Sequence, residues 1–365
     1  MISLNSSNTP TTEFVHAEPI LIVPAWIMKY YVLDLSPHNS LVKYLVDQGH
    51  TVFMISWRNP DSRDRDLGMD DYLNLGILSA LTVIEDIIPN HKVNAMGYCI
   101  GGTLLAITAA YLARKNQGNL NSLTFLATQT DFSEAGELSI FIDDSQVHFL
   151  DDYMWAQGYL NTREMAGIFQ ILKSNDLIWS KLIHNYLSGE RPPISDLMAW
   201  STDATRMPYR MHIEYLKELF LNNTLFEGKY IIEGLPVVLM DINVPIFSVG
   251  TETDHVAPWH SVYKLNMITH SETTFILTSG GHNAGIINEP GHTPHHYRKG
   301  VFRKKYTDPD TWFAQTAVQE GSWWLEWIDW LEERDQAQRV PPPSMGCPDK
   351  GHHPLMPAPG SYVLG

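Results

Sequence analysis

The sequence contains only two cysteines, Cys99 and Cys347, among its 365 residues. A secreted chain of this length commonly carries paired disulfide bridges, so this scarcity predicts a reducing compartment and a cytoplasmic protein. Long apolar runs are also missing, because no stretch of about 18 apolar residues occurs that could span a bilayer. Residues 1–18 are polar and have neither a basic start nor an apolar core. We therefore predict no transmembrane segment and no signal peptide.

Positive charge is scarce as well. The chain has 25 Lys and Arg residues against 41 Asp and Glu residues, which gives a formal net charge of −16. This balance argues against nucleic-acid binding and provides no long-range attraction for anionic substrates. An anionic ligand must therefore meet local basic groups. The hydrophobic content of 44%, with 18% charged residues, instead indicates a large globular core.

Short apolar runs alternate with helical patterns along much of the chain. This alternation predicts a doubly wound, mostly parallel sheet, whose sites lie at the carboxyl ends of the strands. A long helix is expected from Asp70 to about Ile88, and a terminal amphipathic helix is expected after Gly321. We expect the sixth predicted strand to end the sheet. The strands are predicted at residues 20–23, 51–56, 93–97, 123–127, 245–249 and 273–278.

The alternation stops between residues 131 and 244. This segment has helical patches without a regular exchange of strand and helix, and it is rich in Trp, Tyr, Phe and Met. Its aromatic runs fit either plain core or a lid whose apolar inner face covers the site. The predicted organisation is an N-terminal lead-in at 1–18, a core formed by 19–130 and 245–335, a lid (cap) insertion at 131–244 and a Pro/Gly-rich tail at 336–365.

The pattern Gly97-Tyr98-Cys99-Ile100-Gly101 resembles a nucleophile elbow, G-x-S-x-G, with Cys in place of Ser. The central residue of such a turn has a strained backbone, and side chains two residues before and after it would collide. The unpaired first amides of the following helix and its dipole favour a thiolate at Cys99. Because free cysteines are often simply buried, the assignment depends on partners elsewhere in the chain.

Residues with the required chemistry follow two later strands. Asp254 lies in the loop after residues 245–249, and His282 lies after residues 273–278. The order Cys99, Asp254, His282 is the order of the α/β-hydrolase fold, here with a helical lid insertion. His282 would take the Cys99 proton, and Asp254 would orient and stabilise the imidazole. The backbone amides of Ile100 and Ile27, the latter in the loop after the first strand, form the candidate oxyanion hole.

The sequence predicts no metal and no cofactor. His292, His295 and His296 form a histidine-rich stretch, but no carboxylate or cysteine stands at ligand spacing, and we expect these residues on a polar loop. Gly101-Gly102 lacks the downstream Lys and Ser or Thr of a phosphate-binding loop. A thiol that attacks an acyl thioester forms another thioester, so the acyl group stays activated for transfer to an alcohol. This chemistry suits a coenzyme A thioester as the substrate.

Several further motifs carry a family resemblance. They are Leu21-Ile22-Val23-Pro24, Lys29-Tyr30-Tyr31-Val32-Leu33-Asp34-Leu35, Gly49-His50-Thr51-Val52-Phe53, Ser56-Trp57-Arg58-Asn59-Pro60, Gly97-Tyr98-Cys99-Ile100-Gly101-Gly102, Asp196-Leu197-Met198-Ala199-Trp200, Asp203-Ala204-Thr205, Asp254-His255-Val256-Ala257-Pro258-Trp259, Gly281-His282-Asn283-Ala284-Gly285 and Gly321-Ser322-Trp323-Trp324. With these motifs, nearly the whole chain resembles the catalytic domain of single-subunit polyhydroxyalkanoate (poly-3-hydroxybutyrate) synthases.

The resemblance implies that the chain polymerises (R)-3-hydroxyacyl-CoA with release of CoA. Cys99 would carry the growing polyester chain and His282 would activate it. Asp254 would either orient His282 or help to deprotonate the incoming 3-hydroxyl group. The resemblance also implies a homodimer in the cytoplasm, associated with the surface of polyester granules.

Two features depart from the family pattern. Members of this type carry an N-terminal domain before this point, so the chain is either the core of a longer protein or a short form that needs a partner subunit. In the oxyanion loop, Ala25 and Met28 stand where the family has Pro and Asn. The alternative functions are an intracellular polyester depolymerase or thioesterase of the same fold, and a non-catalytic granule-associated subunit. The nearest basic groups for the CoA phosphates are Lys29, Arg58 and the cluster at residues 298–305.

Overall fold

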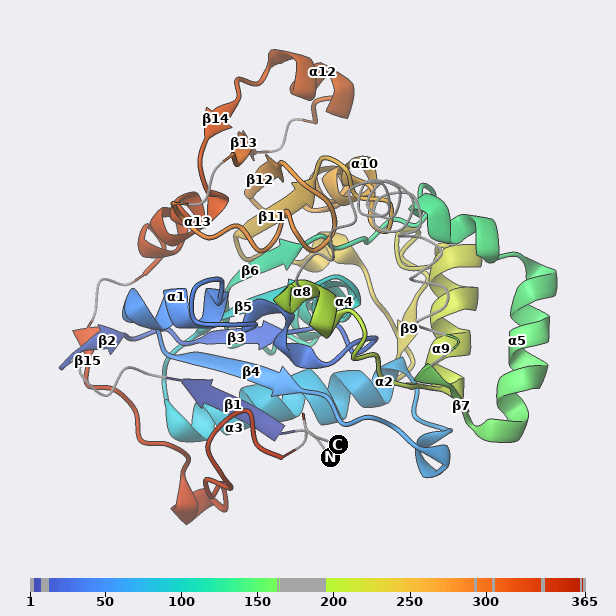
Figure 1. Ribbon diagram of the computed structural model, residues 1–365, viewed down its shortest axis with the longest axis horizontal. Coiled ribbons are helices and arrows are strands. Elements are labelled where there is room, and N and C mark those ends of the chain that lie inside the picture. The colour runs from blue at the N-terminus through green and yellow to red at the C-terminus, as the bar shows by residue number, and fades with distance from the viewer. Residues whose placement is uncertain are drawn as a thin grey trace, which may run out of the picture.

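The computed structural model describes residues 3–7, 13–162, 164, 195–291, 294–303, 306–335, 339–361 and 363. At its centre lies a sheet of nine strands: β1 (Ser3–Ser7), β3 (Ile20–Val23), β4 (Val52–Ser56), β5 (Val93–Tyr98), β6 (Leu120–Leu126), β11 (Ile246–Thr251), β12 (Thr273–Thr278), β13 (His296–Phe302) and β14 (Gln319–Glu320). The spatial order is β1-β4-β3-β5-β6-β11-β12-β13-β14 (Figure 1). The six strands from β4 to β12 in this order are parallel, which confirms the predicted doubly wound sheet.

Antiparallel strands form both edges of the sheet. β1 pairs with β4, and β13 pairs with both β12 and β14. The prediction that residues 273–278 end the sheet is therefore wrong. β13 carries His296, Arg298 and Lys299, and within this strand only Tyr297 and Phe302 are buried, so it lacks the apolar run of a central strand. His296 opens this strand and does not lie on a polar loop.

Helices pack around the sheet. α1 begins after Ser40, whose hydroxyl accepts a hydrogen bond from the Lys43 amide at 2.8 Å, as an N-cap residue does. The long helix expected from Asp70 is present as α2, η3 and α3 in sequence, with a π-helical middle part. No helix among those described is both long and apolar enough to cross a membrane. The helices outside residues 131–244 are η1 (Tyr30–Leu33), α1 (Leu41–Asp47), η2 (Ser62–Asp64), α2 (Met69–Asp71), η3 (Tyr72–Leu78), α3 (Ser79–Ile87), α4 (Ile100–Arg114), α10 (Trp259–Tyr263), α11 (Leu265–Ile268), α12 (Pro309–Gln315), α13 (Trp323–Glu332) and η8 (Pro348–Lys350).

The terminal helix α13 closes the core from one side. Its apolar face buries Trp323, Trp324 and Trp327, as the amphipathic pattern predicts. The Trp327 indole N–H donates a hydrogen bond to the Thr124 hydroxyl on β6 at 2.9 Å, so even the polar atom of this large side chain is satisfied. After α13, β15 (Arg339–Val340) pairs with β2 (Val15–His16) in a small antiparallel sheet.

The segment 131–244 is largely helical where it is described, and residues 165–194 lie outside the described part of the chain. Figure 1 shows α5 and α9 on the side toward which β4 points, which is the carboxyl end of the parallel strands. Asp151 on α5 accepts a hydrogen bond from the Tyr209 hydroxyl and pairs with Lys217 Nζ at 2.7 Å. The elements are η4 (Gly136–Phe141), α5 (Asp144–Gln157), β7 (Tyr159–Leu160), α8 (Asp196–Trp200), β8 (Met207–Pro208), α9 (Tyr209–Glu214), η6 (Tyr215–Leu221), β9 (Ile231–Ile232), β10 (Leu235–Pro236) and η7 (Leu239–Asp241).

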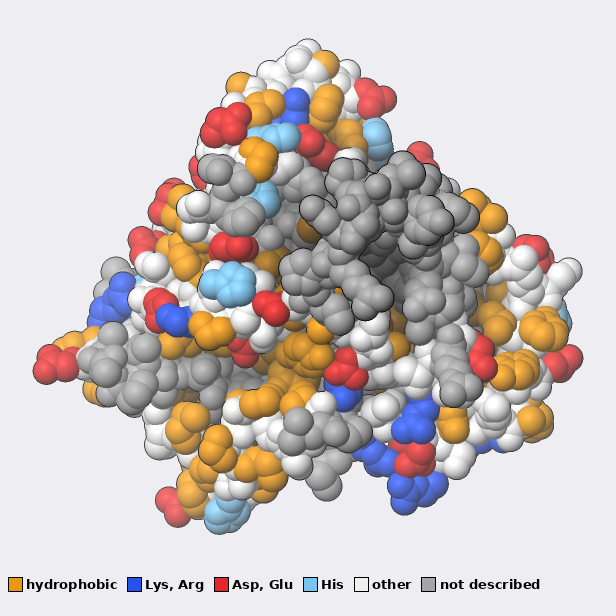
Figure 2. Space-filling view, in the orientation of Figure 1, with side chains coloured by type: hydrophobic (Ala, Val, Ile, Leu, Met, Phe, Trp, Pro, Cys, Tyr) orange, Lys and Arg blue, Asp and Glu red, His pale blue; other side chains and the backbone are white. Residues whose placement is uncertain are grey.

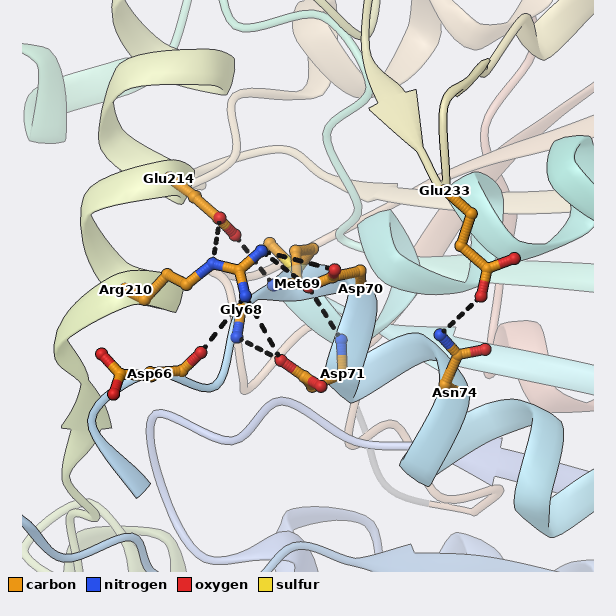
Figure 3. Close-up of polar contacts among 9 residues, drawn as sticks. All are labelled: Asp66, Gly68, Met69, Asp70, Asp71, Asn74, Arg210, Glu214 and Glu233. Atoms are coloured by element: carbon orange, nitrogen blue, oxygen red, sulfur yellow. Dashed lines mark hydrogen bonds and ion pairs between the residues drawn. The ribbon is translucent and has the colours of Figure 1, made fainter. Parts of the chain in front are cut away.

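Arg210 on α9 fastens this segment to the core (Figure 3). Its guanidinium donates to Glu214 Oε1 at 2.8 Å, to Asp70 Oδ1 at 3.2 Å and to the Asp66 carbonyl oxygen at 3.2 Å. The second oxygen of Glu214 accepts a hydrogen bond from the Met69 amide at 3.0 Å, and so satisfies a donor at the start of α2. The start of α2 and the helix α9 are therefore held together by one network of charges.

Candidate active site

Cys99 occupies the turn between β5 and α4. Its backbone has φ 53° and ψ −128°, a strained conformation for a residue other than glycine. A Cβ atom on Gly97 would lie 2.3 Å from the Gly102 Cα atom, and one on Gly101 would lie 2.3 Å from the Val23 carbonyl oxygen. The strand, the turn and the helix therefore pack too closely for side chains at these positions, which is the packing of a nucleophile elbow.

Asp254 and His282 reach this turn from the loops after β11 and β12. His282 Nδ1 lies 2.8 Å from Asp254 Oδ2. Asp254 Oδ1 accepts hydrogen bonds from the amides of Val256 and Ala257 at 2.9 and 2.8 Å, and the Thr251 hydroxyl donates to Oδ2 at 3.0 Å. The Asp254 side chain is fully buried. Both carboxylate oxygens are thus held in one orientation toward the imidazole.

The surroundings of His282 favour its protonated form. Burial alone lowers the pKa of His282, but the charges of Asp254 and Cys99, together with a hydrogen bond to each, outweigh burial and raise the pKa to about 10. At neutral pH the imidazole therefore carries its second proton next to Cys99. An imidazolium at this position can give its proton to a leaving group and, once neutral, can take the proton of an attacking hydroxyl group.

Tyr98 and Thr251 also shape the site, although the sequence analysis did not select them. The Tyr98 hydroxyl donates to Asn283 Oδ1 and lies 3.4 Å from the His282 carbonyl oxygen, with ring centroids of Tyr98 and His282 5.5 Å apart. Burial and the nearby Cys99 and Asp254 raise the pKa of Tyr98 well above its ordinary value, so it remains a neutral donor. A tyrosine and a threonine at strand ends resemble core residues, so the sequence alone contains no signal for either role.

A small cavity lies next to Cys99. Its volume is about 20 Å³, which is room for roughly one water molecule. Phe132, Leu138 and Tyr215 from the segment 131–244 form part of its wall, so this segment contributes directly to the surroundings of Cys99. The other lining residues are mostly apolar. They are Ile27, Ile100, Thr103, Ala127, Gln129, Val256 and Ala257.

Both candidate oxyanion residues line this cavity. Ile100 is the first residue of α4, so its amide belongs to the unpaired donors at the start of a helix. Ile27 lies in the loop that joins β3 to η1. Within the described part of the chain, neither amide donates a hydrogen bond to a backbone carbonyl. The structure thus places both residues beside Cys99, and their role as an oxyanion hole stays a prediction.

The basic residues considered for the CoA phosphates already have acidic partners. Lys304 and Lys305 of the predicted cluster lie outside the described residues. Lys29, Arg58 and Arg298, which the structure describes, each pair with a carboxylate, so their charges are already compensated. The ion pairs are Lys29 Nζ with Asp203 Oδ1 at 3.1 Å, Arg58 Nη2 with Asp61 Oδ2 at 3.0 Å and Arg298 Nη1 with Glu252 Oε1 at 2.8 Å.

The histidine-rich stretch precedes Arg298, and His296 shares Glu252 with it. His292 is outside the described residues, and His296 Nε2 pairs with Glu252 Oε2 at 3.1 Å. Over the described ranges, no group of three or more His, Cys, Asp or Glu side chains is arranged to hold a metal ion.

Comparison with known proteins identifies the fold family. A sequence model of the alpha/beta hydrolase fold matches residues 18–289. The chain belongs to the alpha/beta hydrolase fold family. Two similar solved structures, each with a TM-score of 0.50, are a Paleococcus ferrophilus monoacylglycerol lipase and a thermophilic esterase from Thermogutta terrifontis. They are 10% and 11% identical to this alpha/beta hydrolase and cover 92% of it, with 100% and 94% of their own chains matched. At such low identity the likeness shows the fold alone.

Closer relatives by sequence confirm the resemblance to polyhydroxyalkanoate synthases. The chain is 42% identical over 357 residues to a poly(3-hydroxyalkanoate) polymerase of Methylorubrum extorquens. It is 41% and 37% identical to poly(3-hydroxyalkanoate) polymerase subunits PhaC of Rhizobium meliloti and Cupriavidus necator. Each match covers 97% of this alpha/beta hydrolase, which spans only 58%, 57% and 60% of the length of these three relatives.

Proposed function

We propose that this chain acts as the catalytic domain of a polyhydroxyalkanoate synthase, which polymerises (R)-3-hydroxyacyl-CoA and releases CoA. One observation carries the proposal: a cysteine, Cys99, stands in the elbow beside the His282–Asp254 pair, in a chain 42% identical to a poly(3-hydroxyalkanoate) polymerase. A thiol nucleophile preserves the thioester character of the acyl group, whereas hydrolysis would discard it. The substrate is thus a CoA thioester, and no further cofactor takes part.

In the first half-reaction, the Cys99 thiolate attacks the carbonyl carbon of the acyl-CoA. The bond from the carbonyl carbon to the CoA sulfur then breaks, and His282 gives its proton to the departing CoA thiolate. The acyl group remains on Cys99 as a new thioester. The amides of Ile100 and Ile27 stabilise the oxyanion that forms between these two steps.

In the second half-reaction, the 3-hydroxyl group of a neighbouring hydroxyacyl unit attacks the Cys99 thioester. Neutral His282 takes the hydroxyl proton, an ester bond forms, and the Cys99 thiolate leaves beside the imidazolium that results. Asp254 acts through His282 in this scheme. Both of its oxygens are already occupied by donors from Thr251, Val256, Ala257 and His282, which supports orientation of the imidazole over direct deprotonation of the substrate.

The proposal extends to the surroundings of the chain. We propose that residues 131–244 form a lid, because Phe132, Leu138 and Tyr215 help to enclose a cavity too small for an acyl-CoA. We also propose a cytoplasmic homodimer that works at the surface of polyester granules. Exposed apolar residues on α5, where Phe149 and Trp155 are 68% and 62% exposed, support contact with an apolar partner (Figure 2).

The test is turnover of (R)-3-hydroxybutyryl-CoA by the purified chain, with free CoA quantified by chromatography and the product sized after extraction. We expect CoA release with high-mass polyester, abolished by Cys99→Ala and retained by Cys347→Ala, the matched control at the other free cysteine. Release of monomeric 3-hydroxybutyrate alone would make the chain a thioesterase. Absence of CoA release, with and without an added partner subunit, would indicate a non-catalytic protein and contradict the proposal.

A further inference from the structure

The loop that carries Ile27 is held in place by side chains and backbone groups from elsewhere in the fold. The Trp57 indole N–H donates to the Pro24 carbonyl oxygen at 2.8 Å, and the Trp200 indole N–H donates to the Lys29 carbonyl oxygen at 2.7 Å. These bonds fix the two ends of the loop. Between these ends, the carbonyl groups of Trp26 and Ile27 both accept hydrogen bonds from Thr205.

Thr205 makes two hydrogen bonds to this loop. Its hydroxyl donates to the Trp26 carbonyl oxygen, and its amide donates to the Ile27 carbonyl oxygen at 3.1 Å. The neighbouring residues continue the contact, because the Lys29 amide donates to the Asp203 carbonyl oxygen at 3.2 Å. Thr205 is buried, with 3% of its surface exposed, so water does not replace these bonds.

The hydroxyl bond acts on the candidate oxyanion donor itself. The Trp26 carbonyl and the Ile27 N–H belong to one peptide group, which is planar and trans. In such a group the C=O and N–H bonds point in opposite directions. The Thr205 hydroxyl therefore fixes the direction of the Ile27 N–H by holding the other end of its peptide group. Ile27 lines the cavity beside Cys99, where the oxyanion would form.

We propose that Thr205 is a positioning residue, which aims the Ile27 amide at the oxyanion. The inference rests on the oxyanion role given to Ile27 under the proposed function. It adds that a residue from the segment 131–244 completes the hole, although it touches no reacting atom. An oxyanion hole needs donors that are aligned before the charge develops, so a freely rotating peptide group would stabilise the oxyanion less.

The substitution Thr205→Val separates this role from general support of the loop. Valine has the shape of threonine without the hydroxyl, and its amide can still donate to the Ile27 carbonyl oxygen. Thr205→Ser keeps the hydroxyl and should restore activity. Thr108→Val is a matched control, because the buried Thr108 hydroxyl donates to the Leu104 carbonyl oxygen at 2.8 Å inside α4 and not to the oxyanion loop.

The experiment measures acylation of Cys99 by p-nitrophenyl acetate in a single turnover, followed through the release of p-nitrophenolate. All variants carry Cys347→Ala so that Cys99 is the only thiol that can react, and the rate of a Cys99→Ala variant is subtracted as background. Alkylation of Cys99 by iodoacetamide is measured in parallel, because this displacement at a saturated carbon forms no oxyanion. We expect Thr205→Val to lower the acylation rate roughly 10- to 100-fold and to leave the alkylation rate unchanged. Thr205→Ser and Thr108→Val should acylate at the parent rate.

An unchanged acylation rate in Thr205→Val would overturn the proposal. Equal losses in acylation and alkylation would also overturn it, because they would indicate general damage to the elbow. If the valine variant does not fold, the ratio of acylation rates between Thr205→Ser and Thr205→Ala, which differ in the hydroxyl alone, gives the same test. A parent protein that is acylated by p-nitrophenyl acetate but releases no CoA from (R)-3-hydroxybutyryl-CoA would contradict the proposed function and leave the role of Thr205 testable.

Discussion

Replacement of Asp254 by Asn changes the charge of the candidate site while it keeps its shape. The amide oxygen of the new side chain can still accept the hydrogen bonds that Asp254 Oδ1 receives from the Val256 and Ala257 amides. The NH₂ group would then face His282 Nδ1 and the Thr251 hydroxyl in place of Oδ2. The loop should keep its conformation, because every position that accepted a backbone hydrogen bond still accepts one.

The electrostatic consequence for His282 is large. A pKa of about 10 in place of 6.5 corresponds to a net of roughly 5 kcal/mol in favour of the imidazolium, because the attraction of Asp254 and Cys99 exceeds the opposing effect of burial. Asp254→Asn removes the attraction and the hydrogen bond of the carboxylate but leaves the burial that lowers the pKa of His282. The new amide also donates to Nδ1, so neutral His282 must carry its proton on Nε2. The imidazole then cannot act as a base through Nε2, the nitrogen that has to take a proton. The same change in a serine protease lowers kcat about 10⁴-fold.

We therefore expect Asp254→Asn to lower kcat for CoA release by roughly 10³- to 10⁴-fold and to shift the titration of His282 to lower pH. Initial rates with (R)-3-hydroxybutyryl-CoA and NMR of ¹⁵N-labelled histidine measure the two effects. Asp310→Asn is the matched control, since Asp310 is 83% exposed and pairs with His260 Nε2 at 3.0 Å outside the site. A variant that keeps a tenth of the parent kcat while His282 still titrates near 10 would refute this reasoning.

Two further predictions concern stability. Gly102→Ala places a Cβ atom 1.9 Å from Thr128 Oγ1 and should lower the free energy of unfolding, measured by urea denaturation, by about 3 kcal/mol. Gly118→Ala is the control, because its Cβ atom meets nothing within 4 Å, and it should change this free energy by less than about 0.5 kcal/mol. Burial lowers the pKa of His50 to about 3 and that of His212 to about 4, so both are neutral when folded and gain protons when unfolded. The free energy of unfolding should therefore fall by roughly 3 kcal/mol for each of these histidines as the pH drops from 6.5 to 4. A free energy of unfolding that does not change over this pH range would contradict the prediction.

The central fold could be predicted because each part of it leaves a local mark in the sequence. Strands that are buried on both faces require continuous apolar runs, so β3, β5 and β12 are visible as such. The elbow is visible because its close packing excludes side chains at Gly97 and Gly101. The edges of the sheet leave no comparable mark, since β13 has two adjacent charged residues, Arg298 and Lys299, and few buried ones, and so resembles a loop in the sequence.

The hydrogen bonds that hold the site in place could not be predicted, and the reason is a different one. The Thr205 hydroxyl bonds to a carbonyl 179 residues away in the chain, and any residue supplies a carbonyl, so no spacing or residue type marks the partner. Tyr98 likewise reads as an apolar strand residue until its hydroxyl is placed against Asn283. Sequence patterns thus reveal groups that need a special residue type, such as Cys99 and His282, and they miss groups that depend on where two distant backbones meet.

The raised pKa of His282 fits the proposal that the nucleophile is the Cys99 thiol and not a hydroxyl. In a serine triad the histidine must be neutral at the start, because it has to take the proton of the hydroxyl as the substrate is attacked. A histidine with a pKa of about 10 is already protonated at neutral pH, and in the mechanism we propose that proton can pass to the departing CoA thiolate. Acylation of Cys99 then removes one of the charges that raise the pKa of His282. In the proposed second half-reaction the imidazole would then be a better base for the hydroxyl proton, so one histidine would serve as acid and base in alternate steps.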